Sequence, residues 1–288
     1  MSAYRLNVPT RRGSVLNGVL FRSDGLKAKS LLIAITGIHG NFYSNPFYYN
    51  IGDTLSSNNF DFIYAQTNDA FNRIETVNVK TGRPEIIGSY NEYFSYTDED
   101  IDAYLDFAEH EGYMKVILAG HSLGANKVIY YLSRHHDVKR VAHFLLLSPA
   151  NLEWLTKNVT EHEKDIVLSR VREGRGKDML PFELMGWVPC IADTAYEWLF
   201  TDTLNNVHVE QDKDFSQAEK ITHSGALLIG TYDNFTYGDP AGFLKGINDH
   251  IPTALDNKLI FIEGTGHTYQ RKEQEAADKI LELMKEWE

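Results

Sequence analysis

Ser122 has the sequence surroundings that a nucleophilic serine needs. It is the centre of Gly120-His121-Ser122-Leu123-Gly124, which follows an apolar run and precedes an apolar stretch with helical spacing. A Gly-x-Ser-x-Gly pattern between a strand and a helix is typical of a sharp, strained turn that exposes the serine hydroxyl beside backbone amides. Glycines suit both flanks because a side chain there would collide with the tightly turned backbone. The sequence therefore predicts Ser122 as the nucleophile of an acyl transfer.

His267 is the histidine best placed to activate that serine. A serine hydroxyl attacks efficiently only when a general base takes its proton and a carboxylate orients the base. The chain has 11 histidines, and His267 lies in a Gly-containing turn directly after the last apolar run. His223 precedes its predicted strand, at the wrong end of the sheet, and His250 falls between strands. We expect His121 to be positional, because neighbouring side chains at such a turn point apart.

Asp233 is the predicted acid that orients His267. It follows the apolar run 225–232 and precedes His267 by 34 residues. A carboxylate at a strand end can reach the histidine loop and hold one imidazole nitrogen. Asp239 and Asp249 lie further into the next loop and helix, and Glu263 lies within the last predicted strand.

Two backbone amides are candidates for holding the negative charge that develops on the carbonyl oxygen. One is the amide of Leu123, directly after the nucleophile. The other belongs to the loop Gly37-Ile38-His39-Gly40-Asn41, and two registers fit, with either Ile38 or Asn41 as the donor. We favour Ile38 because the preceding strand is expected to end at Thr36.

The elements that must position these residues form an α/β pattern. Continuous apolar runs alternate with helical stretches, as in a mostly parallel sheet with helices on both faces. The opening segments 3–8 and 14–22 predict an antiparallel hairpin, a second small hairpin is expected around 81–84, and Thr97 is predicted to cap a helix. The predicted parallel strands are 30–36, 60–66, 115–120, 141–148, 225–232 and 258–264.

A long segment between two predicted core strands is predicted to be a cap. Residues 1–149 and 223–288 form the expected core, and 150–222 the cap or lid, since so long an insertion is rarely a plain loop. The insertion holds three of the four tryptophans, which either shape the substrate pocket or fill the core of the cap. Residues expected to border the pocket are His39, Asn41, Phe42, Tyr43, Trp154, Trp187 and Trp198.

The composition excludes several classes of partner. A net charge of −12 argues against nucleic acid and anionic membrane surfaces, because phosphate binding needs clustered Lys and Arg. The apolar runs are too short to span a bilayer. With one cysteine, Cys190, and no secretory pattern, we expect a cytoplasmic protein. The chain has no His-Glu-x-x-His motif and no paired Cys/His spacing, so we expect no metal or organic cofactor.

The chain resembles the α/β-hydrolase-fold serine hydrolases from end to end, through the opening hairpin, the GHSLG motif at 120–124, Asp233 and His267. The resemblance implies a Ser122–Asp233–His267 triad that cleaves a small-molecule carboxylic ester through a covalent acyl-enzyme. AGHSLGANKVIYYLS is similar to the group containing the fungal fusarinine siderophore esterases, although the loop at 37–41 departs from the Gly-Gly pattern of that group. This similarity makes bulky natural esters candidate substrates.

Other functions are compatible with the same fold and the same candidate residues. A thioesterase or amidase with the same triad, a cofactor-free perhydrolase and a non-catalytic ligand-binding protein of the hydrolase fold all fit the sequence. The sequence leaves the oligomeric state open.

Overall fold

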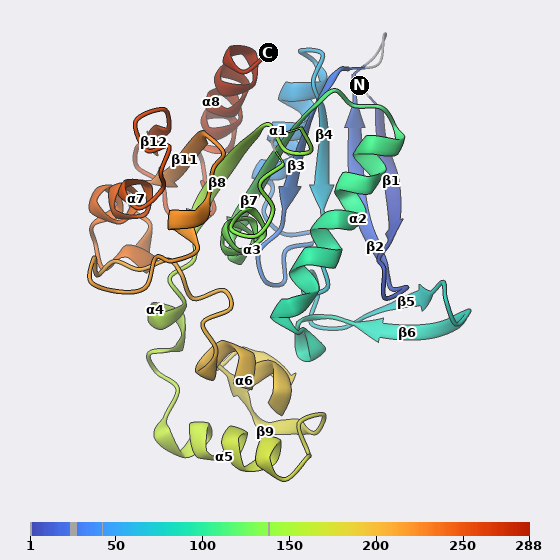
Figure 1. The fold of residues 1–288 in the computed structure, drawn as a ribbon, viewed down its shortest axis with the longest axis vertical. Coiled ribbons are helices and arrows are strands. Elements are labelled where there is room, and N and C mark those ends of the chain that lie inside the picture. The colour runs from blue at the N-terminus through green and yellow to red at the C-terminus, as the bar shows by residue number, and fades with distance from the viewer. Residues whose placement is uncertain (1, 24–27, 42, 138) are drawn as a thin grey trace.

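The computed structural model describes residues 2–23, 28–41, 43–137 and 139–288. Within them, the main sheet has eight strands in the order β1-β2-β4-β3-β7-β8-β11-β12 (Figure 1). These strands are β1 (Ser2–Pro9), β2 (Val15–Arg22), β3 (Ser30–Ile35), β4 (Asp61–Ala65), β7 (Lys115–Ser122), β8 (His143–Pro149), β11 (Gly225–Gly230) and β12 (Lys258–Ile262).

The sheet is parallel from β4 to β12, and its first two strands form the predicted antiparallel hairpin. Every residue of β3, β4 and β11 is buried. This burial explains why their sequences are continuous apolar runs instead of alternating patterns. Because the parallel strands run in one direction, the residues that follow them meet at one edge of the sheet.

Helices cover both faces of the sheet, as the sequence predicts. α1 (Phe47–Ser56) and α8 (Glu273–Glu286) pack over one apolar core. α2 (Thr97–His110), α3 (Leu123–Leu132) and α7 (Pro240–Asp249) pack over the other. The fold class predicted from the sequence is confirmed: a mostly parallel central sheet lies between two helical layers (Figure 1).

The prediction that Thr97 caps α2 is wrong. Tyr96 occupies the cap position, Thr97 is already helical, and its side chain makes no capping hydrogen bond. The short 3-10 helix η2 (Phe94–Tyr96) leads directly into α2, and the Thr97 N–H donates to the Phe94 carbonyl. The preceding turn therefore supplies a hydrogen-bond acceptor for a backbone N–H at the start of α2, a role that a capping side chain would otherwise have.

The predicted cap leaves the sheet after β8 and contains α4 (Leu152–Thr156), α5 (Glu161–Arg172), α6 (Ala192–Phe200) and the hairpin of β9 (Met179–Leu184) and β10 (Val188–Ile191). In Figure 1, α5, β9 and α6 lie together beyond one end of the sheet. They share an apolar cluster with Leu123, the residue after the predicted nucleophile, and with the partly buried Ile38. The insert therefore packs directly over the serine turn.

The packing of the insert divides it at about residue 204. The Asn126 side chain of α3 bonds to both the N–H and the carbonyl of Ala150 and to the carbonyl of Leu204, so it joins the two points where the insert leaves and returns. Beyond that point, Val207, Phe215, Ala218 and Ile221 are buried in the core under α3 and α7. The last part of the predicted range 150–222, which includes the 3-10 helix η3 (Ala218–Lys220), thus packs with the main core.

The predicted small hairpin is present as β5 (Ile74–Asn78) and β6 (Arg83–Ile87), and it projects from the body of the molecule (Figure 1).

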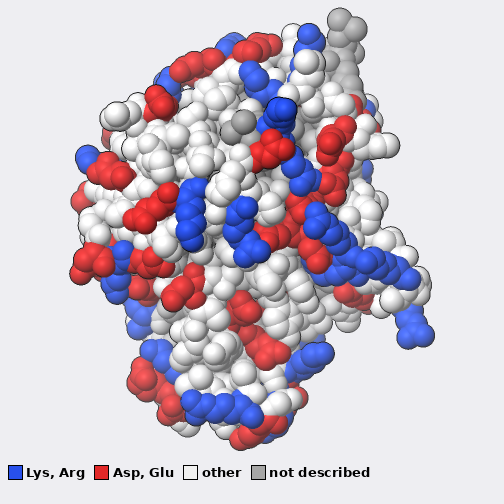
Figure 2. Space-filling view, in the orientation of Figure 1, with Lys and Arg blue, Asp and Glu red and all other residues white. Residues whose placement is uncertain are grey.

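On the face drawn in Figure 2, acidic and basic side chains are interspersed. Among the described helices, none combines the length and the apolar character needed to cross a membrane.

Candidate active site

The turn at Ser122 is strained and tightly packed. Ser122 has φ 57° and ψ −127°, a backbone conformation that a non-glycine residue adopts only when its surroundings enforce it. A Cβ on Gly120 would lie 2.1 Å from the Gly124 carbonyl oxygen, and a Cβ on Gly124 would lie 2.4 Å from the Ile35 carbonyl oxygen. Both flanking glycines are therefore required by close backbone approach, and β7 can pass into α3 within one residue.

We expect Gly124→Ala to destabilise the protein by about 1–3 kcal/mol, because the new methyl group has no room beside the backbone of β3. Gly266→Ala is the matched control, since its Cβ would come no closer than 3.5 Å to any neighbour. Urea unfolding measures both variants. An unchanged midpoint for Gly124→Ala would contradict the packing described for the turn.

Asp233 and His267 form a hydrogen-bonded pair. His267 Nδ1 lies 2.8 Å from Asp233 Oδ2, and the other carboxylate oxygen accepts the Phe235 N–H at 3.0 Å. Burial of Asp233 favours a raised pKa, but the hydrogen bond and charge of His267 outweigh it and lower the pKa of Asp233 below its ordinary value. The carboxylate is therefore ionised at neutral pH and holds the imidazole with Nε2 pointing away from it.

His121 holds the loop that carries His267, the predicted base, against the turn at Ser122. His121 Nε2 lies 2.8 Å from the carbonyl oxygen of His267, and the two ring centroids are 4.9 Å apart. Because His121 immediately precedes Ser122, this bond brings the His267 loop to the nucleophile turn. Within the described part of the chain, His267 Nε2 is buried and has no hydrogen-bond partner, so no hydrogen bond joins it to Ser122 here. Catalytic hydrogen bonds commonly tighten only when substrate binds.

His121 makes stability depend on pH. Two causes lower the pKa of His121 from 6.5 to about 3: burial is the larger, and the charge of the neighbouring His267 is the second. Below about pH 6.5 the unfolded chain binds a proton that the folded chain does not, so this contribution to stability is complete above pH 6.5 and is lost progressively toward pH 3. We expect the group to remove about 2 kcal/mol by pH 5.

His121→Gln places an amide donor near the position of Nε2, within reach of the His267 carbonyl, and should flatten this dependence when urea unfolding is compared at about pH 7.5 and pH 5. Buried His208 and His223 also have lowered pKa values, caused first by burial, and add to the acid loss in both proteins. An equal acid loss in wild type and variant would exclude His121 as a source.

The loop 37–41, which is predicted to supply the second oxyanion donor, lies directly against the predicted nucleophile. A Cβ on Gly37 would come within 2.8 Å of the Ser122 Cβ. Leu123 is the first residue of α3, so its N–H has no partner within the helix. The Asn41 N–H already donates to Ser44 Oγ at 3.0 Å, whereas within the described residues the Ile38 N–H makes no hydrogen bond. The geometry thus favours Ile38 over Asn41 as the second donor.

The expected pocket residues of this loop have defined partners. His39 has φ 58°, its Nε2 lies 2.6 Å from Ser89 Oγ, and its ring meets Trp187 edge-on at 5.2 Å. The Asn41 side chain donates to the His39 carbonyl and accepts the Tyr43 N–H, which stabilises the loop itself. Phe42 lies outside the described residues.

The other two tryptophans of the insert occupy different surroundings. Trp154 contacts the ring of Phe235 at 4.8 Å, and Phe235 contacts the ring of His267 at 4.2 Å. Trp198 is buried in the insert and packs on Phe94 at 5.4 Å. Trp154 is therefore joined to the candidate site through Phe235. Trp198 instead fills the core of the insert, which was the alternative role predicted for the tryptophans. Sequence reasoning missed Phe235, although an aromatic residue two positions after the acid was a usable signal.

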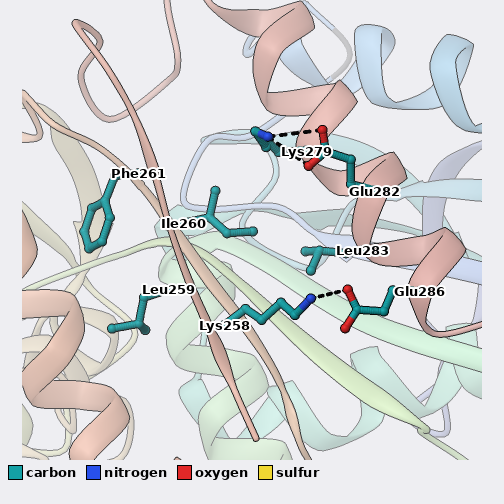
Figure 3. Close-up of a pocket in the computed structure, with 8 residues that line it drawn as sticks. All are labelled: Lys258, Leu259, Ile260, Phe261, Lys279, Glu282, Leu283 and Glu286. Carbon is teal, nitrogen blue, oxygen red and sulfur yellow. Dashed lines mark hydrogen bonds and ion pairs between the residues drawn. The ribbon is translucent and has the colours of Figure 1, made fainter.

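A groove elsewhere on the surface lacks such chemistry. It lies between the edge strand β12 and α8, and Lys258 and Lys279 within it pair with Glu286 and Glu282 (Figure 3). No serine, cysteine or histidine is among the residues that line it. In the described parts of the chain, no group of three or more His, Cys, Asp or Glu side chains could hold a metal ion.

Three esterases share this architecture over nearly their full lengths. Est1E from Butyrivibrio proteoclasticus is 15% identical, with a TM-score of 0.63 and 98% of both chains covered. A highly thermostable carboxyl esterase from Bacillus coagulans is 12% identical, with a TM-score of 0.70, covering 99% of this chain and 98% of that one. The Pyrococcus furiosus esterase Pf2001 is 13% identical, with a TM-score of 0.61, covering 99% of this chain and 93% of that one. At these identities the likeness establishes the α/β-hydrolase fold.

Comparison with protein families and with curated proteins gave different outcomes. No curated protein matched significantly. A family model described as "Protein of unknown function (DUF1749)" matches residues 14–223, which is more than half of the chain. This α/β-hydrolase-fold protein therefore belongs to the DUF1749 family.

Proposed function

We propose that this protein is a serine hydrolase that cleaves carboxylic esters, with Ser122 as nucleophile, His267 as base and Asp233 as the orienting acid. The observation that carries the proposal is the His267–Asp233 pair, bonded at 2.8 Å and held through His121 against the strained turn that presents Ser122. A serine at such a turn, beside an oriented imidazole, is the arrangement that acyl transfer requires.

The reaction has two steps. Ser122 Oγ attacks the ester carbonyl carbon while His267 Nε2 takes the hydroxyl proton, and the amides of Leu123 and Ile38 stabilise the oxyanion. The C–O bond to the alcohol then breaks, and the alcohol leaves with the proton from His267. Water, activated by His267, attacks the acyl-enzyme, releases the carboxylic acid and restores the Ser122 hydroxyl. Asp233 stays ionised throughout and stabilises the imidazolium.

The surroundings of the base favour an ester with an apolar or aromatic part. Phe235 and Trp154 form a continuous pair of rings that begins at His267, and apolar rings next to the reacting atoms exclude water and contact hydrocarbon. The fold shared with three esterases supports the reaction class. The single cysteine, Cys190, is buried and remains consistent with the proposed cytoplasmic location.

Hydrolysis of p-nitrophenyl esters of graded acyl length tests the proposal. We expect release of p-nitrophenol with an initial burst, because p-nitrophenolate is a good leaving group and acylation should therefore be faster than hydrolysis of the acyl-enzyme. A preference among acyl lengths would define the pocket. If the folded protein hydrolyses none of these esters, the proposed function is wrong, and hydrolysis of the corresponding thioesters or amides alone would assign the same triad to that alternative reaction.

A further inference from the structure

A lysine lies fully buried in the helix that begins at the nucleophile. Lys127 is the one charged residue of the stretch 123–132, and it is 1% exposed. Burying an ammonium group costs free energy unless charges and hydrogen bonds compensate it. The partners of Lys127 therefore indicate what it holds in place.

The Lys127 ammonium group has three partners. Nζ donates hydrogen bonds to Glu92 Oε1 at 2.5 Å and to Thr67 Oγ1 at 3.2 Å, and it forms an ion pair with Asp69 Oδ2 at 3.1 Å. Both carboxylates are as buried as the lysine. Burial alone would lower the pKa of Lys127, but Asp69 and Glu92 outweigh it and hold that pKa above its ordinary value. Lys127 therefore remains charged.

One partner leads to the oxyanion loop. The Asp69 carbonyl accepts the His39 N–H at 2.9 Å, and His39 directly follows Ile38, the proposed second oxyanion donor. The first donor, Leu123, opens the same helix that carries Lys127. A closed path thus runs from Leu123 through α3 and Lys127 to Asp69, and from Asp69 through His39 back to Ile38.

The other partner leads to the insert. The Glu92 carbonyl accepts the hydroxyl of Thr194 in α6 at 3.0 Å. Ser89, from the same segment, bonds the His39 ring, and Asn72 donates to the Pro189 carbonyl of the insert hairpin at 2.9 Å. The segment under the insert and the oxyanion loop therefore meet at the same buried charge cluster.

We propose that Lys127 is a positioning residue that sets the separation of the two oxyanion donors by tying the Asp69 and Glu92 segments to the nucleophile helix. This inference rests on the proposed hydrolase function. The lysine touches no reacting atom, so it acts on the oxyanion step through the loop. Loss of the tie should slow acylation and leave ground-state binding of the ester nearly unchanged.

The test compares Lys127→Met with two further variants of the full chain. Lys127→Met leaves two buried carboxylates without their cation, so Lys127→Met/Asp69→Asn/Glu92→Gln removes those charges and protects the fold. Arg140→Met is the matched control, because Arg140 is a cation beside the buried Asp102 at 2.6 Å that has no contact with the oxyanion loop. The readouts are the acylation rate constant and the dissociation constant Ks of p-nitrophenyl acetate, both from single-turnover release of p-nitrophenol, and hydrogen exchange of the His39 amide.

We expect both Lys127 variants to lose about 30- to 100-fold in acylation rate, with Ks within about threefold of wild type. The His39 amide should exchange at least about tenfold faster, since its bond to Asp69 loosens. Arg140→Met should change neither readout by more than about threefold. Wild-type acylation and exchange in the triple variant, or a raised Ks with an unchanged acylation rate, would overturn the inference.

The two proposals fail in different ways. A wild-type protein that hydrolyses no ester refutes the proposed function, and hydrogen exchange at His39 still decides whether Lys127 anchors the loop. A wild-type protein that is active and a Lys127 series that matches it refute the positioning role alone.

Discussion

Ser122→Ala should abolish ester hydrolysis. Replacing the nucleophile removes the covalent step, and we expect kcat to fall by about 10⁴- to 10⁶-fold, with a small remainder from the oxyanion amides and binding. Steady-state hydrolysis of the best p-nitrophenyl ester measures the change. The fold should survive, because the alanine keeps the Cβ and the strained turn is packed by Gly120 and Gly124.

Ser169→Ala is the control for this prediction. Ser169 is exposed on α5 of the insert, and its hydroxyl donates to Glu173 Oε1 at 2.8 Å, so loss of the hydroxyl should leave kcat unchanged. A Ser122→Ala protein that is folded by circular dichroism and retains more than about a tenth of wild-type kcat would mean that another group is the nucleophile.

Asp233→Asn should have the second-largest effect. An amide in place of the carboxylate keeps the shape of the side chain but favours the wrong imidazole tautomer and no longer stabilises the imidazolium. We expect kcat to fall by about 10³- to 10⁴-fold with little change in KM. The same steady-state assay measures it.

Asp239→Asn is the matched control in the same loop. Asp239 caps α7 by accepting the Gly242 N–H at 2.8 Å, and asparagine caps helices about as well as aspartate. Its kcat should stay within about twofold of wild type. If the two asparagine variants lose activity equally, Asp233 has no special role in orienting His267.

Much of the fold was predictable because its signals are local. A strand buried on both faces needs a continuous apolar run, and a sharp strand-to-helix turn needs glycines, so β3, β7 and the Ser122 turn can be read from short segments. Asp233 and His267 follow from topology, since residues after parallel strands gather at one edge. Their hydrogen bond agrees with that reasoning.

The contacts that sequence reasoning missed depend on distant segments. The bond from His121 to the His267 carbonyl joins positions 146 residues apart. The burial of Lys127 depends on Glu92, a residue in an irregular connection with no periodic pattern. Thr97 failed as a cap because a preceding 3-10 turn took over the end of the helix. In each case three-dimensional packing outweighed a local preference.

A fluorophosphonate probe, followed by mass spectrometry of the digested protein, tests most directly whether Ser122, His267 and Asp233 act together. Phosphonylation requires a serine whose proton is withdrawn by a base and whose adduct is held by oxyanion donors. We predict one rapid adduct on the peptide that contains Ser122, and slow labelling in Asp233→Asn. Absence of an adduct in folded wild-type protein, or an adduct on a different serine, would contradict the assignment.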